Sequence, residues 1–173
     1  MEILKDNDPF LQSPTKLVED FSTLKDESYK MVQIMIDNKG IGLAANQVGL
    51  DKSFFIMGAE DEGFLTIANP IIKEISEETI SIEEGCLSYP HLYMNITRPK
   101  EIVTKFIDMD GNEQDNIRFE GMSARVFLHE YDHLQGITFD NRVSPMRLRM
   151  AKKKRSKLVK KMNKQNGTKS RSK

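Results

Sequence analysis

The sequence has one cysteine and no long apolar run, and each of these two features excludes a class of protein. One cysteine cannot form an internal disulfide, so the chain is not a disulfide-stabilised secreted scaffold and suits a reducing compartment. No stretch approaches the roughly 20 apolar residues of a membrane-spanning helix. The amino-terminal MEILKDNDPF has neither the basic start and apolar core of a signal peptide nor the composition of a transit peptide, so we expect a cytoplasmic protein without membrane contact.

Acidic residues are missing from the carboxy-terminal part of the chain. Residues 147–173 contain 13 of the 26 Lys and Arg residues and no Asp or Glu, which leaves residues 1–146 with 13 basic and 26 acidic residues, a formal charge of −13. So many like charges repel one another unless an anionic surface lies nearby. That surface is either the acidic body of the chain itself or an anionic partner.

The length and the apolar pattern predict one domain with a helical tail. A chain of 173 residues is long enough for one domain that buries roughly 70% of its unfolded surface. We expect this domain over residues 1–146 and a basic tail over residues 147–173. The tail begins as an amphipathic helix, and its polar composition after Asn163 predicts a disordered end. The apolar positions at helical spacing are Leu148, Ala151, Leu158, Val159 and Met162.

The string His129-Glu130-Tyr131-Asp132-His133 is the strongest sign of chemistry in the chain. On a helix, residues four apart share a face, so His129 and His133 can offer both imidazoles to one metal ion. Glu130 lies about 100° around the helix and can reach a water at the ion without binding the ion itself. Two His ligands and a Glu base are typical of metal-assisted hydrolysis. By itself, the short pattern also fits two core histidines.

A catalytic metal site needs a third protein ligand, and the one Cys is the best candidate. Cys86 lies in Glu84-Gly85-Cys86-Leu87-Ser88, after a β-like run at residues 79–82. A thiolate binds zinc or ferrous iron well, and the small residues around Cys86 favour a loop. The alternative is that a lone Cys is a small buried hydrophobic residue, which is the more common role.

The segment Gly40-Ile41-Gly42-Leu43-Ala44-Ala45-Asn46-Gln47-Val48-Gly49 is the third unusual stretch. It follows a helical pattern rather than a strand and lacks the Lys-Ser/Thr ending of a P-loop, which excludes nucleotide binding. Its small residues permit close approach of a peptide or of another chain segment, although tight packing is their more common role. Gln47 offers a neutral amide donor that suits an oxyanion.

Together these three segments resemble the peptide deformylase family. The family motifs Gly-x-Gly-x-Ala-Ala-x-Gln, Glu-Gly-Cys-Leu-Ser and His-Glu-x-Asp-His-Leu-x-Gly read here as GIGLAANQ, EGCLS and HEYDHLQG, complete at every fixed position and in the same order. The lead-in at residues 124–127, with Tyr131, looks more like the organelle-type branch. The resemblance covers about residues 3 to 148 and implies an α+β fold, with antiparallel strands around a central metal-binding helix.

The resemblance implies a metal-dependent enzyme that removes the formyl group from the N-terminal formyl-methionine of newly made proteins. The expected ligands of one divalent ion are Cys86, His129 and His133. Fe²⁺ is the expected native ion, with Zn²⁺, Ni²⁺ or Co²⁺ as substitutes, since sulfur and imidazole ligands suit all four. The expected substrates are formyl-methionyl nascent peptides. We expect a monomer whose basic tail at residues 147–173 contacts the anionic ribosome.

The resemblance also assigns roles to other residues. Glu130 is the expected base, and Gln47 with the backbone N–H of Leu87 is expected to stabilise the oxyanion. Asp132 is expected to orient a neighbouring group. The residues expected near the substrate groove are Ile41, Gly42, Ile82 and Val126.

Two positions depart from the family pattern. His91 stands where the family usually has Gly and places a larger side chain at the expected rim of the groove, and Leu128 stands where the family usually has Gln. Two other classes of protein share parts of the pattern. A metalloendopeptidase also uses His-Glu-x-x-His but usually takes its third ligand downstream, and a structural zinc module needs a fourth ligand, for which His91 is the spare histidine.

Apolar periodicity predicts the elements that carry these motifs. We expect a helix over residues 17–38, ending at Lys39-Gly40, and a second helix over residues 123–135 with Phe127, Tyr131 and Leu134 facing the core. The segment Asp108-Met109-Asp110-Gly111-Asn112 predicts a hairpin turn. Short strands are expected over residues 54–57, 65–68, 71–75, 79–82, 102–107 and 117–119.

Overall fold

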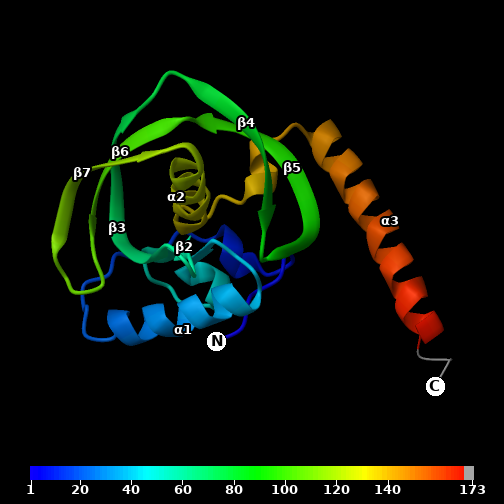
Figure 1. The fold of residues 1–173 in the computed structure, drawn as a ribbon, viewed down its shortest axis with the longest axis horizontal. Helices are drawn as coiled ribbons and strands as arrows, with labels where there is room; N and C mark the ends of the chain where they lie inside the picture. Colours follow the sequence, from blue (N-terminus) through cyan, green and yellow to red (C-terminus); the bar gives the residue numbers. More distant parts are fainter. Residues whose placement is uncertain (170–173) are drawn as a thin grey trace.

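Two antiparallel sheets surround one central helix (Figure 1). The structure is a computed structural model that describes the backbone of residues 1–169 and the side chains of residues 1–165. The larger sheet has the strand order β1-β2-β3-β6-β7, and β4 pairs with β5 alone. Helix α2 (Gly121–Leu134) lies between the two sheets. The predicted α+β fold is therefore confirmed. The strands are β1 (Gly42–Ala44), β2 (Phe54–Ala59), β3 (Gly63–Ile75), β4 (Thr79–Cys86), β5 (Tyr89–Pro99), β6 (Glu101–Ile107) and β7 (Glu113–Glu120).

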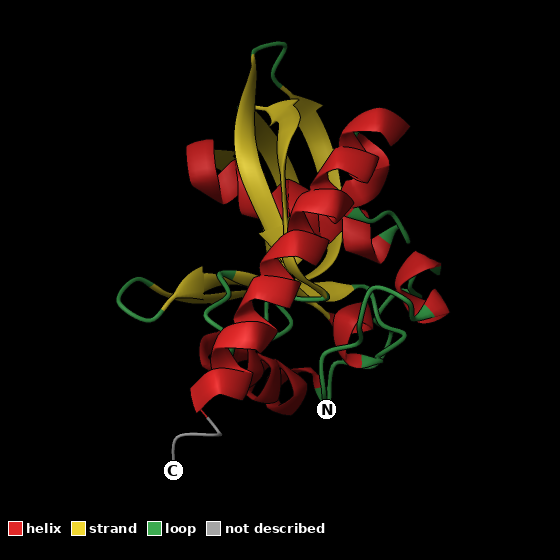
Figure 2. Cartoon of the chain, turned by 90° about the vertical axis from the view of Figure 1, so that its right-hand side faces the viewer, coloured by secondary structure: helices red, strands yellow, loops and turns green. Residues whose placement is uncertain are grey.

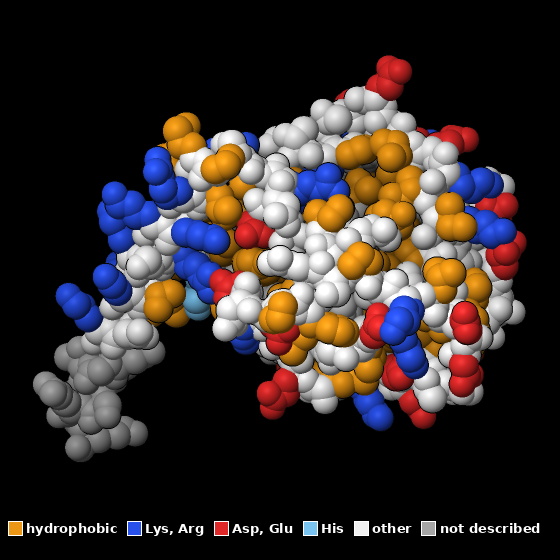
Figure 3. Space-filling view, turned by 180° about the vertical axis from the view of Figure 1, so that it is seen from behind, with side chains coloured by type: hydrophobic (Ala, Val, Ile, Leu, Met, Phe, Trp, Pro, Cys, Tyr) orange, Lys and Arg blue, Asp and Glu red, His pale blue; other side chains and the backbone are white. Residues whose placement is uncertain are grey.

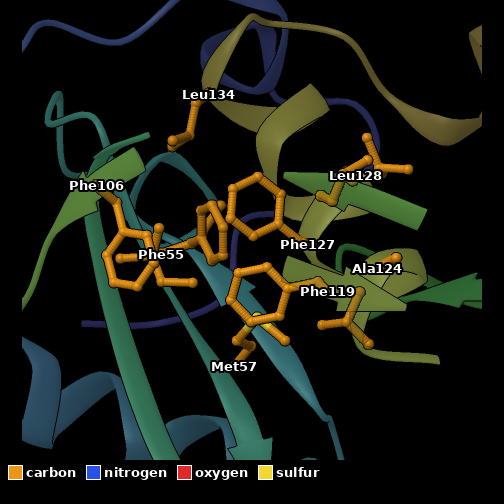
Figure 4. Packing of buried hydrophobic residues seen from close by; sticks show 12 residues of the cluster. Phe55, Met57, Phe106, Phe119, Ala124, Phe127, Leu128 and Leu134 are labelled. Atoms are coloured by element: carbon orange, nitrogen blue, oxygen red, sulfur yellow. The ribbon is translucent and has the colours of Figure 1, made fainter. Parts of the chain in front are cut away.

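Aromatic side chains hold α2 against the larger sheet (Figure 4). The fully buried Phe127 ring has its centroid 5.1 Å from the Phe55 ring of β2 and 5.2 Å from the Phe119 ring of β7. Burial of such a ring contributes about 1.5–3 kcal/mol. Residues two apart point to nearly opposite sides of a helix, so packing Phe127 on this sheet turns His129 towards the other sheet. The residues predicted to face the core are buried (Phe127 and Leu134) or partly buried (Tyr131).

Helix α1 (Leu24–Asp37) begins later than the predicted start at residue 17. The backbone N–H of Val18 donates to the side-chain oxygen of Asn69 (2.8 Å), and the Val18 carbonyl accepts from the Asn69 amide nitrogen (2.9 Å). These bonds to the distant strand β3 occupy backbone groups that a helix needs. The long-range contact thus overrides the local apolar pattern, and the first part of the helix prediction is wrong.

Strand β3 joins two segments that the sequence predicts as separate strands. Asn69 lies between them with φ 49, in the left-handed region that Asn tolerates better than most residues. The register against β6 shifts between Ala68 and Ile71 and again between Ile72 and Glu74. These irregularities bend the strand without ending it, as β-bulges do.

The β4–β5 pair differs most from the prediction. Strand β4 continues from the predicted segment at residues 79–82 to Cys86, so Cys86 ends a strand and does not lie in a loop. Strand β5 was not predicted at all, although its alternate residues Leu92, Met94 and Ile96 are buried and those between them are exposed. This alternation is typical of a strand with one face on a core.

Helix α3 (Pro145–Lys169) runs along β5 and continues beyond the domain (Figures 1 and 2). Near its start, Leu148 and Ala151 pack against the core cluster under β5, whereas further along Leu158 is 41% exposed. The helix passes Asn163, after which composition predicts disorder, and residues 170–173 of that predicted segment lie outside the described residues. Among the helices that the structure describes, none combines the length and the apolar character that crossing a bilayer requires.

The charge asymmetry of the sequence is visible on the molecular surface. Lys and Arg side chains follow α3, whereas acidic side chains are spread over the rest of the view (Figure 3). Arg155 forms an ion pair with Asp6 of the domain. Within the side chains described, Lys152, Lys153 and Lys154 form no ion pair with the acidic body. The body therefore neutralises only part of the charge on α3.

The remaining short helices are 3₁₀ turns: η1 (Pro9–Gln12), η2 (Ala45–Val48) and η3 (Phe139–Arg142).

Candidate active site

Cys86, His129 and His133 meet where the end of β4 faces α2. One candidate ligand atom from each side chain lies within 4.8 Å of the others, and Cys86 Sγ is 3.3 Å from His133 Nε2. A thiolate and two imidazoles in this arrangement fit a zinc- or iron-type ion. His91 is not part of the cluster, and no fourth Cys, His, Asp or Glu of the described chain joins it. A site with three protein ligands suits catalysis better than a closed structural zinc module.

The two imidazoles have different electrostatic surroundings. His129 Nδ1 is 2.9 Å from Glu84 Oε2, which leaves Nε2 as the ligand atom. Burial lowers the pKa of His129, but hydrogen bonds to Cys86 and Glu84 outweigh burial and raise the pKa to about 10. The surroundings of His129 thus favour a positive charge, and a metal ion at Nε2 would supply that charge in place of a proton. Burial holds the pKa of His133 well below its usual value, so this ring stays neutral, as a ligand must.

A buried network of charges fixes the side of α2 that carries the histidines. The Arg98 guanidinium donates to both oxygens of Glu84 (2.7 and 3.0 Å) and to Asp132 Oδ2 (2.7 Å). Arg125 donates to Glu84 Oε1 at 2.7 Å. Burial alone raises the pKa of Glu84, but hydrogen bonds with His129 and Arg98 hold it well below its usual range. Glu84 is therefore a fixed anion that orients His129, and Asp132 orients Arg98 rather than a ligand.

Glu130 lies buried beside the cluster, and Gly42 of β1 makes room for it. A Cβ at position 42 would overlap the Glu130 carboxylate and stand 2.8 Å from Val126 Cγ1, so only glycine fits there. Glu130 is 4% exposed. Burial raises its pKa to about 7, helped by the charge of Glu84 and opposed by that of His129. A carboxylate with this pKa can take up and release a proton near neutral pH.

The Gln47 side chain, which comes from η2, is held beside Cys86 by hydrogen bonds. Its oxygen accepts from the Ala44 backbone N–H (2.9 Å), and its nitrogen lies 3.3 Å from Cys86 Sγ and 3.1 Å from Ser88 Oγ. The first contact fixes the orientation of the amide, so that the N–H₂ group points to the cluster. Leu87 follows Cys86 in the turn between β4 and β5 and lines the same pocket as Gln47.

A pocket of about 570 Å³ opens onto the cluster. Of the residues expected to bind the ion, catalyse the reaction or line the groove, all except His133 line this pocket, namely Ile41, Gly42, Gln47, Ile82, Cys86, Leu87, Val126, His129 and Glu130. His133 lies behind them, 1% exposed. His91 also lines the pocket, with φ 64, at the position where the family usually has Gly. The structure thus gathers the predicted residues around one cavity.

Sequence reasoning missed the residues that position the ligands. Glu84, Arg98, Arg125 and Arg142 were not proposed for the site, although Glu84 lies inside the EGCLS motif. Arg142 of η3 forms a second ion pair with Asp132. A buried glutamate next to a metal-binding Cys is the one local signal that could have indicated a partner for a ligand. Leu128 of α2 stands where the family usually has Gln, and its side chain is buried in the same core cluster as Phe127.

Comparison with known proteins decides the family. The model of the polypeptide deformylase family matches residues 1–149. The chain belongs to the polypeptide deformylase family. The peptide deformylase of Thermotoga maritima is 40% identical over 148 residues, which are 85% of this chain and 89% of that protein. The crystal structure of a peptide deformylase from Synechococcus elongatus in complex with actinonin has a TM-score of 0.85 at 32% identity, and the match covers 90% of this chain and 86% of that one.

Family membership confirms the predicted enzyme activity: the protein is a deformylase, a metal-dependent hydrolase. The cluster of Cys86, His129 and His133 is a site where it can bind the metal ion. The relatives also include a chloroplastic peptide deformylase 1B of Oryza sativa, 36% identical over 83% of this chain and 55% of that protein. Because both bacterial and organellar deformylases are similar to it, membership of the organelle-type branch stays a prediction.

Proposed function

We propose that the residues around the pocket hydrolyse the formyl amide at the N-terminal formyl-methionine of nascent peptides. The observation that carries this proposal is the buried Glu130 carboxylate beside three converging ligands at the wall of a pocket. When bound, a divalent ion there polarises the formyl carbonyl and lowers the pKa of a water from 15.7 towards about 7. Glu130 takes the proton from the attacking water and returns it to the nitrogen of the leaving amine.

Gln47 and Leu87 act on the developing negative charge. Gln47 Nε2 lies 3.3 Å from Cys86 Sγ, so a formyl oxygen next to the cluster comes within reach of its N–H. The Leu87 N–H follows Cys86 directly and adds a second donor from the backbone. One such donor contributes about 3–4 kcal/mol to the stabilisation of a transition state. The contact with Ser88 Oγ (3.1 Å) uses the other N–H of Gln47 and keeps the amide plane fixed.

The apolar walls of the pocket suit the methionine side chain. Ile41, Ile82 and Val126 all line the pocket and offer aliphatic surface. Gly42 also lines the pocket, and because it lacks a side chain the Glu130 carboxylate can lie close to the backbone there. We assign these four residues to substrate binding, while His91 at the pocket rim faces the residue that follows methionine.

A direct comparison of substrates tests this function. The purified enzyme should hydrolyse a short formyl-Met peptide and leave casein intact, with formate as the measured product. Casein cleavage without formate release would support the metalloendopeptidase alternative and would contradict the assignment of the pocket. No observation favours that alternative here, because the third candidate ligand, Cys86, lies upstream of the histidines.

We propose Fe²⁺ as the native ion, with Zn²⁺, Ni²⁺ or Co²⁺ as functional substitutes, because one thiolate and two imidazoles suit all of them. Metal analysis of anaerobically purified protein should give about one iron per chain. The iron enzyme should lose activity in air, while the nickel-substituted enzyme keeps it. Equal decay of both forms would point to oxidation of Cys86 rather than of the ion.

We also propose that α3 tethers a monomeric, cytoplasmic enzyme to the ribosome, whose surface is anionic RNA. Exposed lysines such as Lys152, Lys153 and Lys154 can bind phosphates with release of counterions. Removal of residues 147–173 should weaken co-sedimentation with ribosomes and leave hydrolysis of a short formyl-Met peptide roughly intact. The co-sedimentation of the full chain should fade between low and moderate salt. Binding that survives truncation would contradict the tether.

A further inference from the structure

A second hollow lies next to the candidate active site. It has a volume of about 250 Å³ and is formed by β4 and β5 on one side and α3 on the other. Glu83 and Tyr93 line both this hollow and the active-site pocket, so the two adjoin at these residues. We call it the α3 groove and define it by five of its lining residues: Glu83, Tyr93, Asn95, Arg147 and Met150.

Tyr93 connects the pocket to the α3 groove because of the glycine opposite it. Gly85 and Tyr93 are register partners on β4 and β5. A Cβ on Gly85 would stand 2.7 Å from Tyr93 Cε1, so the ring can lie over the strand only because residue 85 has no side chain. Gly85 directly precedes the candidate ligand Cys86. Tyr93 is 55% exposed, so its ring, opposite Gly85, offers a surface that both hollows share, one residue along β4 from Cys86.

The first turns of α3 form the far wall of the groove. Arg147 Nη2 donates to the backbone carbonyl of Asn95 at 3.0 Å, which ties the helix to β5. Asn95 faces Glu83 in the register of the two strands, on the same side of the sheet as Tyr93. Met150 lines the groove while 65% of its surface is exposed. The groove thus offers an aromatic ring, a flexible thioether side chain and two head groups of opposite charge.

We propose that the α3 groove binds the downstream residues of the formylated peptide, as an extension of the substrate site. This inference rests on the proposed function of the adjoining pocket. Tyr93 and Met150 contact apolar side chains of the peptide, and Glu83 and Arg147 bond to its backbone N–H and C=O groups. The distance from Tyr93 to Asn95 along β5 is roughly 7 Å, about the span of two extended residues. Only a peptide that is longer than the part held in the pocket can therefore place residues in the groove.

Peptide length tests the proposal with free peptides and without ribosomes, which separates it from tethering. The measurement is kcat/KM for a formyl-Met dipeptide and for a formylated apolar peptide of about eight residues. In the unchanged enzyme the longer peptide should have the higher kcat/KM. Met150→Ala should lower the ratio of the long-peptide to the short-peptide value about three- to ten-fold. Met146→Ala is the matched control, because Met146 is equally exposed on α3 (63%) but does not line the groove, and it should leave the ratio unchanged.

A crosslink gives a readout that does not depend on activity. A formylated peptide with a photoreactive side chain near its carboxy terminus should crosslink to residues of the α3 groove, located by mass spectrometry. If the short peptide is hydrolysed but length has no effect, or the crosslink falls elsewhere, the groove proposal is wrong and the proposed function stands. If no formylated peptide is hydrolysed, the proposed function itself fails.

Discussion

Charged side chains gather in two regions of this protein, and the two regions handle charge in opposite ways. Around α2, Glu84, Arg98 and Asp132 are at most 6% exposed, and Arg98 reaches both carboxylates at 2.7 Å. Along α3, lysines such as Lys152 and Lys153 are exposed, and no ion pair with the body is found for them in the described part of the chain. Removing a charge from water is costly unless a partner replaces the water, whereas an exposed charge needs no partner.

The difference indicates what each region is for. The buried network is rigid because each of its charges depends on the others, and it holds His129 through Glu84. The exposed lysines of α3 remain accessible to an external partner because the domain does not cover them. Substitutions in the two regions should therefore differ both in size and in the property they change.

The largest effect is expected at the base that the network surrounds. Glu130→Ala should lower kcat/KM about 10²–10⁴-fold, because proton transfer from the water and to the leaving amine loses its carrier. Metal content should remain near one equivalent, since Glu130 lies outside the ligand cluster. The measurements are formate release and metal analysis on the same sample. Loss of metal together with activity would assign Glu130 to the ligands.

The next effect concerns the network itself. Arg98→Ala should lower the free energy of unfolding by about 3–5 kcal/mol, because it leaves two buried carboxylates without their shared cation. Denaturant unfolding measures the change, and Arg149→Ala on α3 is the control, with an expected change within about 0.5 kcal/mol. A similar loss in both variants would remove the distinction between the two regions.

A smaller effect is expected where α3 contacts the amino-terminal segment of the domain. Arg155 on α3 pairs with Asp6, and their side chains are 22% and 29% exposed. Arg155→Ala should lower the free energy of unfolding by about 0–1 kcal/mol, the range of surface ion pairs. Thermal unfolding at low and high salt checks this, because salt should erase the difference. A loss that is large and independent of salt would indicate that α3 is held mainly by apolar packing.

The smallest effect concerns a partly exposed carboxylate in the hairpin turn between β6 and β7. Burial opposes ionisation of Asp108, but hydrogen bonds from Asn112, Gln114 and Asp110 together outweigh it and lower its pKa below the ordinary value of 3.8. A carboxylate whose pKa is lower in the folded protein stabilises the fold at pH values above its pKa in the unfolded chain. That stabilisation is lost as the pH falls through its pKa in the folded protein. Asp108→Asn should therefore reduce the melting temperature slightly at pH 7 and leave it unchanged at a pH below the folded pKa. A difference that persists in acid would assign the effect to packing.

Local patterns account for what the sequence predicted correctly. The spacing of His129 and His133 and the apolar stripe through Phe127 are properties of one helix, so α2 and its two faces follow from neighbouring residues. The hairpin between β6 and β7 likewise depends on the turn residues around Gly111, which has φ 84.

Contacts between distant residues account for what was missed. The Glu84–Arg98 and Arg98–Asp132 pairs join residues 14 and 34 apart, which no local pattern reveals. The start of α1 moved because Val18 bonds to Asn69, 51 residues away. Strand β5 is different, since its alternation was readable and only Pro90 and Pro99, residues that usually interrupt strands, obscured it.

The three candidate ligands come from two separate parts of the fold, and this has a thermodynamic consequence. Cys86 belongs to the β4–β5 pair, and His133, which is 47 residues away, belongs to α2. An ion bound to both acts as a crosslink that only the folded chain can offer, so free metal shifts the folding equilibrium by mass action. At a hundred-fold excess over the dissociation constant this shift amounts to about 2.7 kcal/mol. The amount of folded enzyme in a cell is thus tied to the supply of the ion that the enzyme uses.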